Sequence, residues 1–217
     1  MEEWKRAKGR LAHSTAPPPI YSSIPHHARP RDVSCPMPLP VPPALPYKLA
    51  CLCDLRDAQG RVLLLRRLRE PNKGLCSPIG GKLDMHTGES PAQCAQREIM
   101  EEAGIHVPIE RLHLLGLISE RAYEGKGHWL LFYYRVMGPV EVTRTSINEG
   151  TLEWFHEREL EGLPLPESDR RVIWPLVRRC EKSYDPKVAG SRPGFFALHI
   201  DCGESGEMTW EVEQVEE

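Results

Sequence analysis

The sequence predicts an α/β fold in which a mixed β-sheet is covered by helices and followed by a C-terminal β-hairpin. Three observations support this prediction. Apolar, strand-like runs recur along the chain, at residues 47–55, 61–67, 111–122, 127–137 and 150–155. Two segments of helical character, 90–104 and 168–182, fall among these runs, and residues 195–214 alternate in polarity. Interleaved strands and helices are typical of a sheet covered by helices.

Residues 1–46 differ in composition from the rest of the chain. They hold eleven of the 21 prolines and show little apolar periodicity, so we expect a disordered or polyproline-like leader. Two alternatives remain open. The segment is a ligand for a proline-recognising domain, or Met37 is the true start of translation. We expect a folded domain over residues 47–182, then a linker and the C-terminal hairpin over 183–217, packed on that domain.

The folded part is predicted to begin with a β-hairpin, because the runs 47–55 and 61–67 flank the turn-like sequence DAQG. A loop containing REPNKGLCSPIGG then leads to the first helix. Ser90 is its expected N-cap, Pro91 its first residue and Gly104 its stop. Its apolar stripe comprises Ala92, Ala95 and Ile99.

The segment 168–182 is predicted to form a second long helix, in which Pro175 is a defect because proline kinks or ends a helix. The sequences FFALHIDC and EMTWEVEQ around GESG predict the C-terminal hairpin. On each strand the apolar residues alternate on one face, and they are Phe196, Leu198 and Ile200, then Met208, Trp210 and Val212.

Composition excludes several classes of function. A net charge of −3 and the lack of a long basic run argue against binding of a nucleic-acid polymer. The chain has no apolar run of about 20 residues and no signal-peptide h-region, and its seven cysteines lack regular spacing. We therefore expect a soluble cytoplasmic protein with no membrane partner; the sequence leaves the oligomeric state open.

The first predicted helix carries three carboxylates on one face. Glu98, Glu101 and Glu102 are spaced i, i+3 and i+4, so their Cβ atoms lie only about 5–6 Å apart. Such like charges repel, and a divalent cation would compensate for the repulsion. The alternative is a solvated helix face without chemistry.

The stretch GGKLDMHTGESPAQCAQREIMEEAGI resembles the Nudix box, whose pattern is G-x5-E-x7-R-E-U-x-E-E-x-G-U with U apolar. From Glu89 onward every fixed position matches. Seven residues instead of five separate Gly81 from Glu89, which is a two-residue expansion of the loop before the helix. The resemblance implies the Nudix-type α/β/α sandwich and covers roughly residues 47–182.

The resemblance also implies roles for named residues. Glu98, Glu101 and Glu102 would be catalytic and, with the Gly80 carbonyl, would ligate Mg²⁺ or Mn²⁺. Glu149 is our candidate for a further acidic ligand, although a loop glutamate is ordinarily only solvated, and either Glu98 or Glu149 would be the general base. In the rest of the motif we expect a structural Glu89–Arg97 ion pair, Gly104 ending the helix and Lys82 near phosphate.

The layout before the box resembles the MutT-like branch of the family, which includes hydrolases of 8-oxo-dGTP. In those relatives an asparagine before the glycines often reads the base, and Ser77 stands at that position here. Glu167 and Asp169 are candidates for contacts to a purine edge; alternatively, Ser168 or Asp169 is a helix N-cap. Tyr123 lies at about the distance from the box at which diadenosine polyphosphate hydrolases carry a tyrosine.

The expected function is Mg²⁺-dependent hydrolysis of a nucleotide, a (d)NTP or oxidised dNTP, to NMP and pyrophosphate. ADP-ribose and dinucleoside polyphosphates are alternative substrates. Two alternatives of another class are a Nudix module that binds a nucleotide without catalysis and a proline-rich adaptor.

Overall fold

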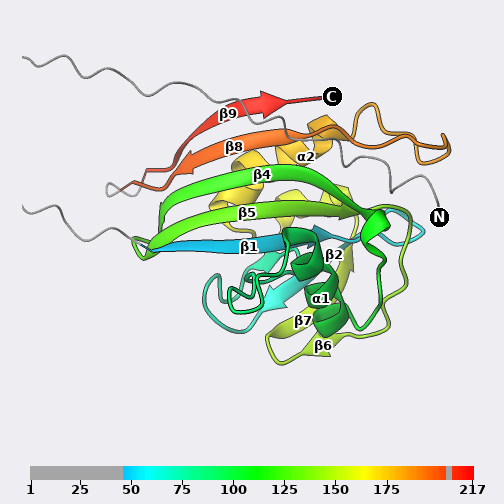
Figure 1. The fold of residues 1–217 in the computed structure, drawn as a ribbon, viewed down its shortest axis with the longest axis horizontal. Coiled ribbons are helices and arrows are strands. Elements are labelled where there is room, and N and C mark those ends of the chain that lie inside the picture. Colours follow the sequence, from blue (N-terminus) through cyan, green and yellow to red (C-terminus); the bar gives the residue numbers. More distant parts are fainter. Residues whose placement is uncertain (1–45, 204–206) are drawn as a thin grey trace, which may run out of the picture. The chain divides into compact units, whose positions relative to one another are not determined.

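The computed structural model describes residues 46–203 and 207–217 (Figure 1). The predicted leader therefore lies outside the described residues except for Pro46, and so does most of the predicted GESG turn. The strands and helices, in chain order, are β1 (Tyr47–Asp54), β2 (Val62–Arg67), β3 (Cys76–Ser77), α1 (Pro91–Ala103), the 3-10 helix η2 (Ile109–Arg111), β4 (Leu112–Tyr123), β5 (Gly127–Val136), β6 (Ser146–Ile147), β7 (Gly150–Phe155), the 3-10 helix η3 (Glu157–Gly162), the π-helical segment η4 (Asp169–Ile173), α2 (Trp174–Cys180), β8 (Phe196–Asp201) and β9 (Thr209–Val215).

The predicted mixed sheet is confirmed. Five strands pair in the order β1-β5-β4-β8-β9, with β1 parallel to β5, β4 parallel to β8 and the other pairs antiparallel. A second, antiparallel sheet has the order β3-β2-β7-β6. The predicted opening hairpin is wrong as a pairing. Its turn exists, with a single bridge between Arg56 and Val62, but β1 and β2 then continue into different sheets.

The core has two parts, one on each face of the five-stranded sheet. Alternate residues of β5 separate them: Tyr133 packs with α2, and Tyr134 packs with α1. Strand β2 also contributes to both parts, because Leu64 joins the α2 side and Leu65 joins the α1 side. Burial on both faces explains why the sequence of β2 is a continuous apolar run.

Helix α1 forms as predicted. The Ser90 hydroxyl accepts a hydrogen bond from the Gln93 backbone N–H, and the Gln93 side-chain oxygen accepts one from the Ser90 backbone N–H, which completes a capping box. Pro91 occupies the first turn, and Gly104 ends the helix with φ of 74°. This φ lies in the left-handed region, which glycine adopts without strain.

The second predicted helix is divided. Residues 169–173 form the π-helical segment η4, and α2 starts only at Trp174. Pro175 thus lies in the first turn of α2, directly after the π-helical segment, so the irregular part of the helix coincides with the residue that lacks a backbone N–H. Ser168 precedes this segment, but its side chain makes no capping hydrogen bond. The alternative that Ser168 caps the helix through its side chain is therefore wrong.

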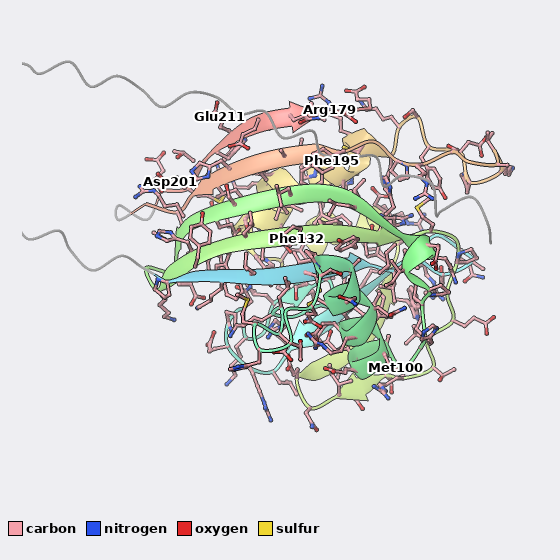
Figure 2. All side chains as sticks on the ribbon, in the orientation of Figure 1. Met100, Phe132, Arg179, Phe195, Asp201 and Glu211 are labelled. Atoms are coloured by element: carbon pink, nitrogen blue, oxygen red, sulfur yellow. The ribbon has the colours of Figure 1, made fainter. Side chains whose placement is uncertain are left out.

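The C-terminal hairpin, formed by β8 and β9, extends the five-stranded sheet beside β4. Phe196, Leu198 and Ile200 of β8 are buried, as the alternation predicts. Strand β9 is the sheet edge, and Trp210 and Val212 on it stay exposed. Glu211 projects outward from the same strand (Figure 2). No helix within residues 46–203 and 207–217 is long and apolar enough to cross a membrane.

Candidate active site

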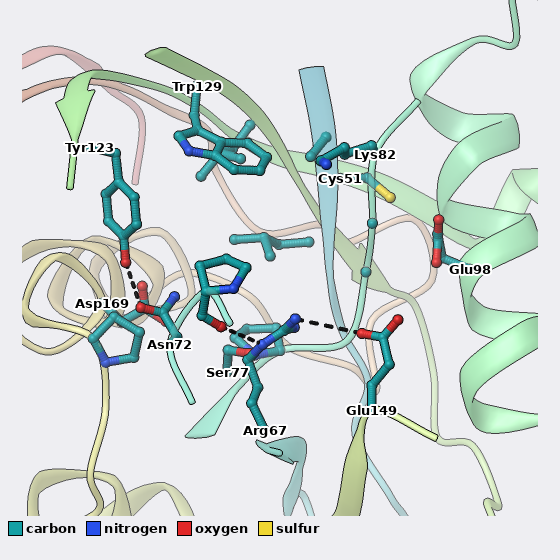
Figure 3. Close-up of a pocket in the computed structure, with 18 of the residues that line it drawn as sticks. Cys51, Arg67, Asn72, Ser77, Lys82, Glu98, Tyr123, Trp129, Glu149 and Asp169 are labelled. Carbon is teal, nitrogen blue, oxygen red and sulfur yellow. Dashed lines mark hydrogen bonds and ion pairs between the residues drawn. The ribbon is translucent and has the colours of Figure 1, made fainter. Parts of the chain in front are cut away.

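A pocket of about 520 Å³ lies where β1, α1, the end of β4 and the loops before β3 and η4 meet. One end of it, the acidic end, is lined by Glu98, Glu101 and Glu149. The opposite end, the aromatic end, is lined by Asn72, Glu120, Tyr123, Trp129 and Asp169. Figure 3 shows Glu98 and Glu149 apart from Tyr123 and Asp169 across the pocket.

Arg97 organises the acidic end. Its Nη2 lies 2.6 Å from Glu89 Oε1, and its Nη1 lies 2.7 Å from Glu98 and 3.3 Å from Glu101. The predicted Glu89–Arg97 pair is therefore present, and the hydrogen bond from Arg97 lowers the pKa of Glu89 to about 2. Arg97 also donates to the Lys82 carbonyl, so it ties the loop to α1.

The expanded loop before α1 closes on itself. The Asp84 backbone N–H donates to Glu89 at 2.7 Å, and the Asp84 side chain accepts from the backbone of His86 and Thr87. This turn accommodates the two additional residues within the loop itself. The expansion therefore leaves Gly80 in contact with the carboxylates.

Gly80 connects the loop to Glu102. Its N–H donates to Glu102 Oε2 at 2.9 Å, and its φ is 148°. A Cβ at this position would lie 2.2 Å from the carbonyl oxygen of Cys51, so only glycine fits. Burial raises the pKa of Glu102 to about 7; the Gly80 N–H opposes this rise, and the charges of Glu98 and Glu149 add to it.

The predicted additional acid, Glu149, reaches the same end of the pocket from the turn before β7. Arg67 pairs with it at 3.5 Å, and its charge acts on both Glu98 and Glu102. Burial, the largest effect, raises the pKa of Glu98 above its usual range, while Arg97 acts in the opposite direction. Four carboxylates from two segments therefore lie close to one another.

A hard divalent cation fits the chemistry of this end, because the available donors are carboxylate and backbone oxygens. Within the described part of the chain, no three acidic, histidine or cysteine side chains are positioned to bind one metal ion together. The reason is that Arg97 holds Glu98 and Glu101, and the Gly80 N–H holds Glu102.

At the aromatic end, Asn72, Glu120 and Trp129 are residues that sequence reasoning did not assign to the site, whereas it named Asp169 as a binding candidate. The Tyr123 hydroxyl donates a hydrogen bond to the Asn72 side chain. The Lys48 ammonium lies over the Trp129 ring, 4.9 Å from its centroid. Glu120 and Asp169 are only 4% and 7% exposed. Burial raises the pKa of Glu120 to about 7 and that of Asp169 to about 8, and the Glu120 charge adds to the second shift.

These shifts predict that Glu120→Gln stabilises the protein at pH 9 but hardly at pH 4. The pKa of Glu120 is higher when folded, so the unfolded chain ionises first and stability falls as the pH rises toward 7. A shift from 4.5 to about 7 corresponds to about 3 kcal/mol. Urea unfolding at both pH values measures the difference; equal gains at pH 4 and pH 9 would contradict it.

The other predicted binding residues divide between pocket and surface. Ser77, Lys82 and Asp169 line the pocket. Glu167 does not line it; its side chain is exposed and pairs with Arg171 at 2.6 Å. A signal for Glu120 was present in the sequence, because it occupies an inward position of β4 between Ile118 and Ala122.

Known proteins share sequence and fold with this chain. The family model described as NUDIX domain matches residues 46–179. Human diphosphoinositol polyphosphate phosphohydrolase is 34% identical over 109 residues, which are 50% of this chain and 56% of the human protein. The chain thus spans little more than half the length of this relative.

Two solved structures share the fold. The MutT protein of Bacillus halodurans superimposes with a TM-score of 0.58 at 24% identity, covering 76% of this chain and 97% of its own. The MutT protein of Methanosarcina mazei gives 0.55 at 23% identity, with coverages of 64% and 97%. These likenesses establish the α/β sandwich.

Proposed function

The chain belongs to the Nudix family, and from this premise we propose that it is a Mg²⁺- or Mn²⁺-dependent pyrophosphohydrolase of nucleotides. Its substrate is a (d)NTP or oxidised dNTP, which it converts to NMP and pyrophosphate. One observation carries the proposal: a single pocket is lined at one end by Glu98, Glu101 and Glu149 and at the other by an aromatic ring and buried polar groups. The first part suits a metal-bound pyrophosphate, and the second suits a heterocycle.

Glu98, Glu101, Glu102, Glu149 and the Gly80 carbonyl would hold the cation. When bound, such a cation neutralises phosphate charge and lowers the pKa of a coordinated water. Glu98 or Glu149 accepts the proton of the attacking water, and Arg97 orients Glu98 for this task. Lys82, with Ser77 farther inside, contacts the phosphate chain from the pocket wall.

A second candidate is a more highly phosphorylated substrate. Arg69 and Lys82 line the pocket, and neither side chain has an acidic partner among the described residues. Further phosphate groups would supply that partner, as in a dinucleoside polyphosphate or the diphosphoinositol polyphosphates that the human relative is named for. ADP-ribose remains a third possibility, and binding of a nucleotide without turnover is the alternative of another class.

The discriminating experiment incubates the purified protein with Mg²⁺ and, in turn, dNTPs, 8-oxo-dGTP, ADP-ribose, diadenosine polyphosphate and a diphosphoinositol polyphosphate. We expect NMP and pyrophosphate from the triphosphates, loss of activity with EDTA and recovery with Mg²⁺ or Mn²⁺. Nucleotide binding by calorimetry without product formation would instead identify a binding module. Turnover of the inositol compound alone would establish the second candidate.

A further inference from the structure

Arg67, the last residue of β2, lies in the pocket wall and contacts segments from both ends of the pocket (Figure 3). Its Nη2 lies 3.5 Å from Glu149 Oε2 at the acidic end. Its Nε donates to the Pro71 carbonyl at 2.8 Å, in the loop that leads to the aromatic end. The side chain is only 16% exposed, so these contacts and the pocket wall determine where the guanidinium lies.

Backbone hydrogen bonds also tie Arg67 to the loop before β3. The Arg67 N–H donates to the Leu75 carbonyl at 2.9 Å, and the Arg67 carbonyl accepts from the Gly74 N–H at 2.8 Å. The guanidinium bond to Pro71 reaches the same loop. Arg67 is therefore held by its backbone and by its side chain.

The turn before β7, which carries Glu149, lies directly against β2. The Leu68 N–H donates to the Glu149 carbonyl at 2.7 Å. At the next residue, Gly150, a Cβ would lie 2.0 Å from the carbonyl oxygen of Arg66, so only glycine allows the turn to approach this closely. These contacts fix the Glu149 backbone, and only the direction of its side chain remains to be set.

Glu149 has neighbours of like charge. Its charge raises the pKa of Glu98 and of Glu102, which means that these side chains repel one another when they are ionised. The Glu149 side chain is 46% exposed, so this repulsion alone would turn it toward solvent. Arg67 acts in the opposite direction, because it attracts Glu149 directly and its charge lowers the pKa of Glu102.

We propose that Arg67 is a positioning residue for the hydrolysis: it holds the Glu149 carboxylate beside the carboxylates of α1, where Glu149 ligates the cation or accepts the proton of the attacking water. Arg97 holds the carboxylates of α1 in a similar way. Each of the two segments that supply the cluster thus has an arginine of its own. This inference rests on the proposed function, since it adds a residue to the same reaction.

A double-mutant cycle tests whether Arg67 acts through Glu149. Hydrolysis of dGTP with Mg²⁺ is measured for the native chain, Arg67→Gln, Glu149→Gln and the double variant. We expect each single substitution to lower kcat at least about tenfold with a smaller change in KM, and the double variant to be no slower than Glu149→Gln. Arg67→Lys keeps the charge but not the planar fork, so it should recover only part of the rate.

Arg66→Gln is the matched control for the cycle. Arg66 precedes Arg67 on β2, pairs with Glu153 at 3.2 Å and does not line the pocket, so kcat and KM should both stay native. Losses that multiply in the double variant would overturn the inference, because Arg67 would then act independently of Glu149. So would a rise in KM alone, which would identify Arg67 as a direct contact to the phosphates.

Crystal structures of the native chain and of Arg67→Gln separate failure of this inference from failure of the proposed function, because they require no turnover. In the variant we expect the Glu149 side chain to point away from Glu102, with the backbone of the turn before β7 unchanged. That result supports the positioning role even if the native protein hydrolyses no nucleotide. A Glu149 carboxylate that keeps its native position without Arg67 would overturn the role, whatever the rate of hydrolysis.

Discussion

Glu102→Gln is expected to lower kcat for nucleotide hydrolysis by about a hundredfold to a thousandfold, with the fold intact. The substitution removes a negative charge from the proposed cation site, where charge stabilisation in the transition state is worth this much. The glutamine oxygen still accepts the Gly80 N–H that Glu102 accepts at 2.9 Å. The loop before α1 therefore keeps its position, and the fall in kcat comes from the missing charge and not from a change in structure.

The measurement is initial velocity against Mg²⁺ concentration, with circular dichroism as the check on folding. Glu141→Gln is the matched control, because Glu141 is exposed and does not line the pocket. We expect its velocity curve to overlay that of the native protein. If Glu102→Gln hydrolysed the nucleotide as fast as the native protein, the Glu102 carboxylate would have no role in the mechanism.

Helix α1 was predictable residue by residue because its signals are local. Ser90, Pro91 and Gly104 each act within one turn of the backbone, and the structure places all three as predicted. Strand pairing was not predictable in the same way. Strands β1 and β2 are joined by a short turn, yet β1 pairs with β5, more than 70 residues away, because both faces of each strand must be covered.

The two ends of the pocket differ in the same respect. The acidic end was predictable because the box places its carboxylates within a single helix, and only Glu149 had to be sought elsewhere. The aromatic end is assembled from separate segments, so no motif marks Asn72 or Trp129. The sequence marks this end only by an ionisable residue at a strand position that faces the interior, and Glu120 is such a residue.

Asp54 shows the same pattern at a site of structural importance, and Asp54→Asn is expected to destabilise the fold by about 3–5 kcal/mol. Its carboxylate is fully buried, 2.9 Å from Arg56 Nε and 2.7 Å from Arg135 Nη1. Glu181, just after α2, bonds the same two arginines and so ties α2 to the sheet. Asp54→Asn removes the negative charge that Arg56 and Arg135 share, so two buried guanidinium groups lose an anionic partner.

Urea unfolding measures this loss, and Glu153→Gln is the control. Glu153 pairs with Arg66 at 3.2 Å, but its side chain is 41% exposed, so Glu153→Gln should lower the free energy of unfolding by about 1 kcal/mol or less.

Burial alone would raise the pKa of Asp54, but Arg135 and Arg56 outweigh it and lower the pKa. The stabilisation is therefore complete above the unfolded-state pKa of about 4 and is lost as the pH falls through the lower folded-state pKa. Because Asp54→Asn lacks this titration, its unfolding free energy should converge on that of the native protein in acid; a constant difference down to pH 2 would show that the loss comes from packing and not from charge.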